Sequence, residues 1–148
     1  MLFYENWPSI LLLVATVFWS VYNYDRSLIF PLFLDKILST TTNHILHTAI
    51  IPITLWEVLL RPRVEPKSHR RNLLQLAFHL IVYLSVLYYT YYEKGIWLYP
   101  MFAVAYNNGV IQFALIHVVI GLLSLFFYYS QWFINSLVHG TVARKKVN

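Results

Sequence analysis

The sequence predicts an all-α protein, a polytopic membrane helix bundle with about four transmembrane helices and short interfacial segments. Hydrophobic residues make up 59% of the 148 positions and charged residues only 11%. A soluble domain averages about 25% charged residues, so this chain has too few to cover a water-exposed surface. The charges also gather in short clusters between apolar runs, a pattern typical of membrane topology signals. We therefore expect residues 1–148 to form a single membrane domain.

The first predicted span covers residues 7–24, which carry no charge and have aromatic residues towards both ends. A bilayer core needs about 17–25 apolar residues, so this run is just long enough. Residues 27–38 are too short to cross and are interrupted by Pro31, so we expect them to lie along the membrane surface. The Ser and Thr residues at 39–42 and Asn43 then offer N-caps for a second span at 44–60, which Pro52 should kink.

The third span is predicted at residues 72–92, after the basic loop 61–71. No Lys, Arg, Asp or Glu occurs from Gly95 through Ala143, but Asn107-Asn108-Gly109 is a strong break. Residues 96–106 are too short to cross, which predicts a re-entrant or interfacial segment. The fourth span is then expected at 110–129, with 130–140 trailing off along the surface.

The distribution of basic residues predicts the orientation of the bundle. Loop 61–71 and the tail 141–148 together hold eight Lys and Arg residues, against three, Arg26, Lys36 and Lys94, on the opposite side. Because cytoplasmic segments carry the excess of Lys and Arg, both termini and loop 61–71 should be cytosolic. The tail ends Lys145-Lys146-Val147-Asn148, the spacing of a dilysine retrieval signal, which predicts an endomembrane location, the endoplasmic reticulum.

This orientation brings polar residues from four segments to the same, non-cytosolic membrane face. They are Asp25, Asn43, His44, His47, Glu93, Trp97 and Tyr99. Ionisable side chains at membrane depth are costly and mark functional sites. The alternative is that any membrane bundle has polar helix ends, and that the histidines are interfacial.

A neutral histidine there can serve as general base for a hydroxyl nucleophile. His47 lies deeper in its span than His44, which makes His47 the better base. Asn43, His44, Asp25 and Tyr99 are candidates to orient it or to donate to an oxyanion, and spacing does not choose among them. A metal is not expected, because His-x-x-His offers two ligands and a catalytic zinc takes three from the protein. The chain has no cysteine, and it has no Gly-rich phosphate loop that would bind a nucleotide, so no cofactor is expected. Nucleic acid is not expected as a ligand either, because the basic residues lie in short clusters between apolar runs.

Several short motifs resemble one family in matching order. They are Thr16-Val17-Phe18-Trp19, Tyr24-Asp25-Arg26, Phe30-Pro31, Leu34-Asp35, Asn43-His44 through His47-Thr48, Pro52-Ile53-Thr54-Leu55 with Glu57, Leu60-Arg61-Pro62, and Trp97-Leu98-Tyr99-Pro100. Together they resemble the androgen-induced protein and androgen-dependent TFPI-regulating protein family of multi-span endomembrane proteins.

The resemblance implies a threonine-type hydrolase of fatty acid esters of hydroxy fatty acids, with His47 as the catalytic base and a fatty acyl ester as substrate. The family's threonine nucleophile lies in an earlier helix with no counterpart here, so the first two helices of the family are expected to be missing. Thr16, Thr48 and Thr54 do not match that nucleophile. The alternative function is a non-catalytic membrane protein that binds lipid or a protein partner. A small transporter is the least favoured function, since no inverted repeat is visible.

The orientation can be tested with sealed microsomes that contain the protein with a C-terminal tag. Protease added outside should remove the tag, because the predicted orientation leaves it in the cytosol. A glycosylation acceptor placed near Lys36 should be modified on the luminal side. Protection of the tag would reverse the orientation and move the polar face to the cytosol.

Overall fold

A computed structural model of the chain describes residues 6–145, apart from the side chains of Leu32, Phe33 and residues 141–145. The predicted all-α fold is confirmed, since the described residues form helices and no strand. The α-helices are α1 (Trp7–Tyr24), α2 (Thr40–His47), α3 (Ile50–Leu60), α4 (Arg70–Lys94), α5 (Pro100–Asn107) and α6 (Val110–Lys145). Two 3-10 helices, η1 (Arg26–Leu28) and η2 (Leu32–Lys36), follow α1.

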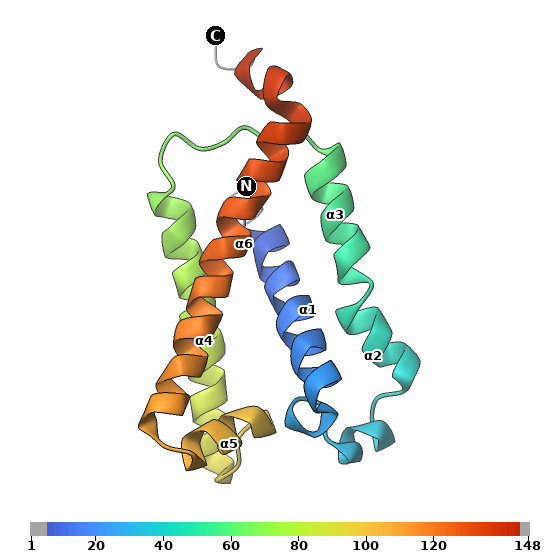
Figure 1. Ribbon diagram of the computed structural model, residues 1–148, viewed down its shortest axis with the longest axis vertical. Helices are drawn as coiled ribbons and strands as arrows, with labels where there is room; N and C mark the ends of the chain where they lie inside the picture. The colour runs from blue at the N-terminus through green and yellow to red at the C-terminus, as the bar shows by residue number, and fades with distance from the viewer. Residues whose placement is uncertain (1–5, 146–148) are drawn as a thin grey trace.

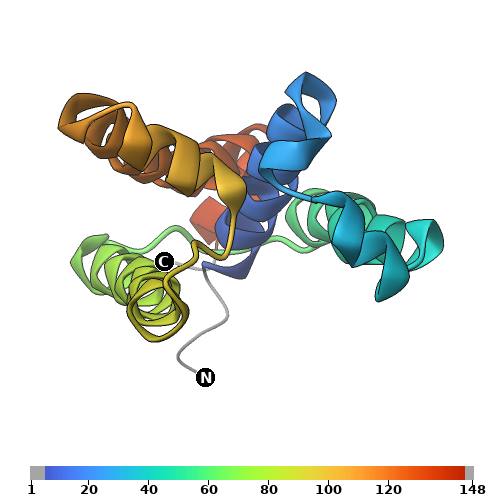
Figure 2. The ribbon, with the colours of Figure 1, turned by 90° about the horizontal axis from the view of Figure 1, so that it is seen from below.

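Helix α1 is the centre of the bundle, between α3 on one side and α6 on the other (Figures 1 and 2). The loop after α3 lies at one end of the bundle with the end of α6, and η1, η2, the start of α2 and α5 lie at the opposite end (Figure 1). The segments that carry the predicted polar face therefore do meet at a single end.

Three stretches are long and apolar enough to cross a membrane: Thr40–Leu60, Arg70–Lys94 and Val110–Gly140. Their outer surfaces carry large apolar side chains that would be costly in water, such as Phe78, which is 59% exposed, and Phe126, which is 61% exposed. Helix α1 is not among the three. Its 18 residues extend roughly 27 Å, close to the 30 Å of a bilayer core, and its crossing stays a prediction.

The expected kink at Pro52 is confirmed and divides the second span into α2 and α3. Proline has no N–H to bond the carbonyl of Thr48, and that carbonyl instead accepts from the N–H of Ile51 at 3.0 Å. The N–H of Ala49 bonds back to the carbonyl of His44 at 3.2 Å, so the chain turns at residues 48–49 before α3 begins. His47 is the last residue of α2 and lies directly before this break.

Three other local predictions are confirmed. The hydroxyl of Ser39 caps α2 by accepting from the N–H of Thr42 at 3.1 Å. Residues 96–106 contain the short helix α5, which is too short to cross a bilayer. The break before α6 lies at Gly109, whose φ of +112° favours glycine.

Residues 130–140, expected to trail off along the surface, instead continue α6 and belong to the third candidate span. Helix α6 continues to Lys145 over 36 residues, roughly 54 Å. Its polar residues Gln131 and Asn135 are buried because they bond the loop after α3. Asn135 accepts from the N–H of Arg63 at 3.0 Å and donates to the carbonyl of Arg63 at 2.8 Å. Residues 146–148, which belong to the proposed retrieval signal, lie outside the described part.

The hydrogen bonds between Asn135 and Arg63 should contribute to the free energy of unfolding of the protein. Asn135→Leu keeps the branched shape and the number of heavy atoms of the side chain but leaves the Arg63 N–H and carbonyl without these partners. It should lower the free energy of unfolding in detergent micelles by about 1–3 kcal/mol, measured by circular dichroism. The exposed Asn23→Leu is the control and should stay within about 0.5 kcal/mol. Equal effects from the two variants would show that the Arg63 contact is not stabilising.

Candidate active site

The end of α2 holds His47 firmly against α1. The imidazole ring of His47 lies flat on the ring of Phe18, with centroids 3.6 Å apart and planes 10° from parallel. The indole N–H of Trp19 donates to the His47 backbone carbonyl at 3.3 Å. Two neighbouring residues of α1 therefore fix both the ring and the backbone of His47.

A third contact determines which ring nitrogen of His47 carries the proton. Nδ1 lies 3.1 Å from the backbone carbonyl oxygen of Asn43. Because a carbonyl only accepts, Nδ1 must be the donor, and in the neutral ring Nε2 is left with its lone pair. This tautomer is the one that a general base acting through Nε2 requires.

His47 and Tyr99 line the same cavity, which has a volume of about 160 Å³ and lies between α1, α4, α5 and α6. Its lining is almost entirely apolar and comprises Leu13, Val14, Val17, Phe18, Ile29, His47, Leu80, Tyr83, Tyr99, Met101, Phe102 and Ile120. Tyr83 of α4 and Tyr99, just before α5, both line it. The only lining hydroxyls among the described residues belong to these two tyrosines.

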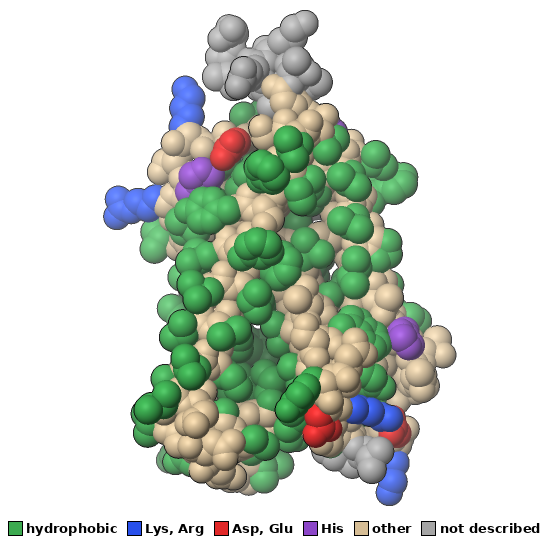
Figure 3. Space-filling model, viewed as in Figure 1, with side chains coloured by type: hydrophobic (Ala, Val, Ile, Leu, Met, Phe, Trp, Pro, Cys, Tyr) green, Lys and Arg blue, Asp and Glu red, His purple; other side chains and the backbone are tan. Residues whose placement is uncertain are grey.

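A larger groove of about 600 Å³ adjoins this cavity between α1, α5 and α6. The groove and the cavity share the side chains of Val17, Met101 and Ile120, which thus form the wall between them. Figure 3 shows a hollow between α6 and α1 near the α5 end of the molecule. Thr16 lines the groove and not the His47 cavity.

The other predicted site residues lie close by but have different partners. The ring of His44 stacks on Trp19 at 5.1 Å, and its Nδ1 is 3.2 Å from the hydroxyl of Thr48. Thr48 is thus paired with His44 rather than with His47. Asn43 is 3% exposed, and its side-chain oxygen has no hydrogen-bond partner in the described part of the chain. Asn43 therefore serves His47 through its backbone carbonyl.

Asp25 has a capping role. Its carboxylate accepts from the hydroxyl of Ser27 at 2.6 Å and from the N–H of Ser27 at 2.9 Å, which begins η1. These bonds hold the pKa of the Asp25 carboxyl below its usual range. Arg26, next to it, pairs with Asp35. The hydrogen bonds of Asp25 are thus local, and neither of these two bonds reaches His47.

Trp97 belongs to a separate aromatic cluster that joins α4, α5 and α6. Its ring stacks on Tyr91 with centroids 4.2 Å apart and lies 5.3 Å from Phe113. In the same cluster the hydroxyl of Tyr88 is 3.1 Å from Nε2 of His117. This packing holds the segment between α4 and α5 in place and so positions the neighbouring Tyr99.

A second buried polar cluster lies at the opposite end of the bundle and was not predicted. The guanidinium of Arg63 donates to Gln131 at 3.3 Å and lies 5.1 Å from the centroid of the Trp132 ring. His69 is 2.8 Å from the hydroxyl of Tyr128. A sequence signal did exist, because the buried polar residues of α6 recur at helical spacing. They are Ser124, Tyr128, Gln131 and Asn135.

Within residues 6–145 no group of three or more His, Asp or Glu side chains is arranged to hold a metal ion. The cavity instead combines a positioned imidazole with apolar walls inside a bundle of membrane-spanning helices. The fold and this site define a polytopic α-helical membrane protein.

Comparison with known proteins gives the family. Residues 3–130 match the FAR-17a/AIG1-like protein family, and the chain belongs to it. The chain is 44% identical over 90 residues to the human androgen-dependent TFPI-regulating protein, covering 61% of this chain and 39% of that protein. It is 39% identical over 100 residues to the rat protein of the same name, covering 68% and 43%.

The human androgen-induced gene 1 protein is 31% identical over 87 residues, covering 59% of this chain and 36% of that protein. The chain therefore spans about two fifths of the length of the curated relatives it matches. No solved structure matches it.

The contact between Trp19 and His47 predicts a second stability effect. Trp19→Phe keeps the aromatic ring but removes the N–H that bonds the His47 carbonyl. Unfolding in micelles should become easier by about 0.5–1.5 kcal/mol. Trp56→Phe is the matched control, because Trp56 is 67% exposed, and it should change stability by less than about 0.5 kcal/mol. A loss as large in the control would mean that the bond is not formed.

Proposed function

We propose that this chain carries the general base of a membrane lipid esterase that hydrolyses fatty acid esters of hydroxy fatty acids. The proposal rests on the contacts that the His47 side chain makes. Its Nδ1 is bonded to a carbonyl, its ring is stacked on Phe18, and it lines a largely apolar cavity. A histidine that only snorkels to headgroups needs none of these contacts.

The reaction assigned to this site is acyl transfer. Nε2 of His47 takes the proton of a hydroxyl nucleophile as its oxygen attacks the ester carbonyl, and then gives that proton to the departing hydroxy-acid oxygen. Water hydrolyses the acyl-enzyme by the same proton transfers. The groove beside the cavity supports entry of an acyl chain from the bilayer, since the groove and the cavity share the side chains of Val17, Met101 and Ile120 as a common wall.

The described residues that line the His47 cavity do not supply the nucleophile of this reaction. No Ser or Thr side chain lines the His47 cavity in the described part of the chain, and Thr54 instead donates to the carbonyl of Ile50 at 2.6 Å. In the longer relatives the family resemblance assigns this role to a threonine outside the matched region. We therefore expect the 148 residues alone to be weakly active, and a fusion to the preceding segment of a longer relative to be active.

The same observation supports a second candidate function. A cavity with an imidazole and two tyrosines, but no aliphatic hydroxyl, also suits a protein that binds a lipid ester without cleaving it. The two functions differ in whether a bound ester is converted to free acid.

The test compares hydrolysis by the fusion protein and its variants. His47→Gln keeps a donor for the Asn43 carbonyl but has no basic nitrogen, and should lower kcat by about 10²–10⁴. His44→Gln is the control and should retain most activity, because His44 faces Thr48 outside the cavity. Full activity in His47→Gln would remove His47 from the mechanism. Binding without hydrolysis in every form would favour the second function.

A further inference from the structure

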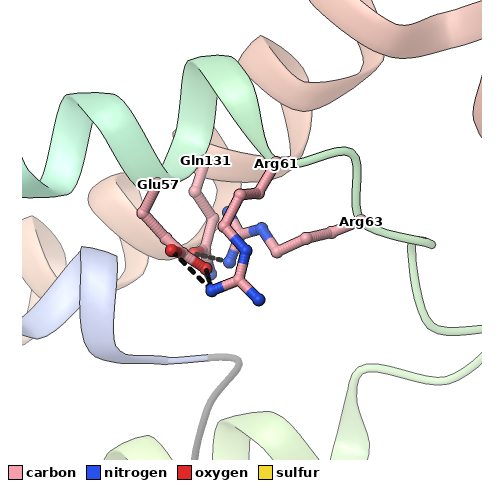
Figure 4. A network of polar contacts seen from close by, with 4 residues as sticks. All are labelled: Glu57, Arg61, Arg63 and Gln131. Atoms are coloured by element: carbon pink, nitrogen blue, oxygen red, sulfur yellow. Dashed lines mark hydrogen bonds and ion pairs between the residues drawn. The ribbon is translucent and has the colours of Figure 1, made fainter.

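The five basic residues of loop 61–71 divide into two groups. Arg61 and Arg63 each have a side-chain partner on a helix of the bundle, Glu57 of α3 and Gln131 of α6, as Figure 4 shows. Arg61 pairs with Glu57 at 3.0 Å, and Arg63 donates to Gln131 at 3.3 Å. These two arginines are therefore used by the fold itself.

The other three basic residues, Lys67, Arg70 and Arg71, are exposed and line one pocket of about 460 Å³. Ser68 and Leu74 also line it. Within the described residues none of the three forms an ion pair with an acidic side chain. The one acidic residue of the loop, Glu65, is 3.5 Å from His69. Figure 3 shows Lys and Arg side chains projecting at this corner of the molecule, where the loop meets the start of α4.

The pocket lies where the head groups of a bilayer would be. Arg70 and Arg71 are the first residues of α4, one of the three stretches able to cross a membrane. One and two turns further, Leu74 and Phe78 are 62% and 59% exposed and face outward. A molecule held by the three cations can thus lay an apolar chain along α4.

We propose that Lys67, Ser68, Arg70 and Arg71 bind the phosphate of an anionic phospholipid head group. Arginine forks match the geometry of phosphate oxygens, and basic clusters next to a spanning helix attract anionic lipids. A topology signal needs only positive charge in this loop. A topology signal does not require three cations without ion-pair partners to gather with a hydroxyl around one pocket. It also does not require the other two arginines of the loop to be bonded elsewhere. The lipid is favoured over a free phosphate compound because the pocket continues into the apolar surface at Leu74.

The proposal is tested by native mass spectrometry of the full chain in detergent with phosphatidic acid as the probe. Arg70→Gln/Arg71→Gln removes two charges from the pocket and should raise the apparent Kd about 25-fold, from about 5-fold per cation. Lys36→Gln/Lys94→Gln removes the same charge at the opposite end and should change the Kd less than about 2-fold. Lys67→Gln should raise the apparent Kd about 5-fold. Because Lys67 lies outside any helix, this variant still tests the proposal if the double variant fails to fold.

Three outcomes would overturn the proposal. The first is an equal loss of binding in the two double variants, which would make the effect one of net charge. The second is equal binding of phosphatidylcholine, which would make the head group irrelevant. The third is competition by glycerol phosphate at the concentrations at which phosphatidic acid binds, which would assign the pocket to a soluble phosphate compound.

Discussion

The flat contact between the rings of His47 and Phe18 is the interaction on which the proposed site depends. It joins α2 to the central helix α1, and the Trp19 indole adds a bond to the backbone of the same histidine. Phe18 also packs against Ile29 and Phe30, so the segment after α1 is held by the same ring. A change in the position of Phe18 would therefore move the base, the cavity wall and η1 together.

The break between α2 and α3 gives this contact its geometry. Proline at position 52 removes one helical bond, and the chain turns at Thr48 and Ala49. Within a membrane, backbone groups freed in this way need new partners. The Ile51 N–H meets that need for the Thr48 carbonyl, and the turn leaves His47 as the last residue of α2, beside α1.

Polar groups occupy both ends of the bundle, with different consequences. At one end, the side chains around the His47 cavity are almost entirely apolar. At the other end, Asn135 and Gln131 tie Arg63 to α6 and keep the loop after α3 folded back onto the bundle. That tie leaves Lys67, Arg70 and Arg71 at the surface.

The sequence by itself determined the helical membrane class, the break at Asn107-Asn108-Gly109 and the kink at Pro52. Each follows from local chemistry: the scarcity of charge, the conformational freedom of Gly109 and the missing N–H of proline. The choice of His47 over His44 as base stays a prediction. Only the tertiary structure decided which α1 residues face His47 and that α6 continues to Lys145. These depend on contacts between residues far apart in the chain, such as Asn135 with Arg63 at a separation of 72 residues. Periodicity within one helix does not show which helix will pack against it.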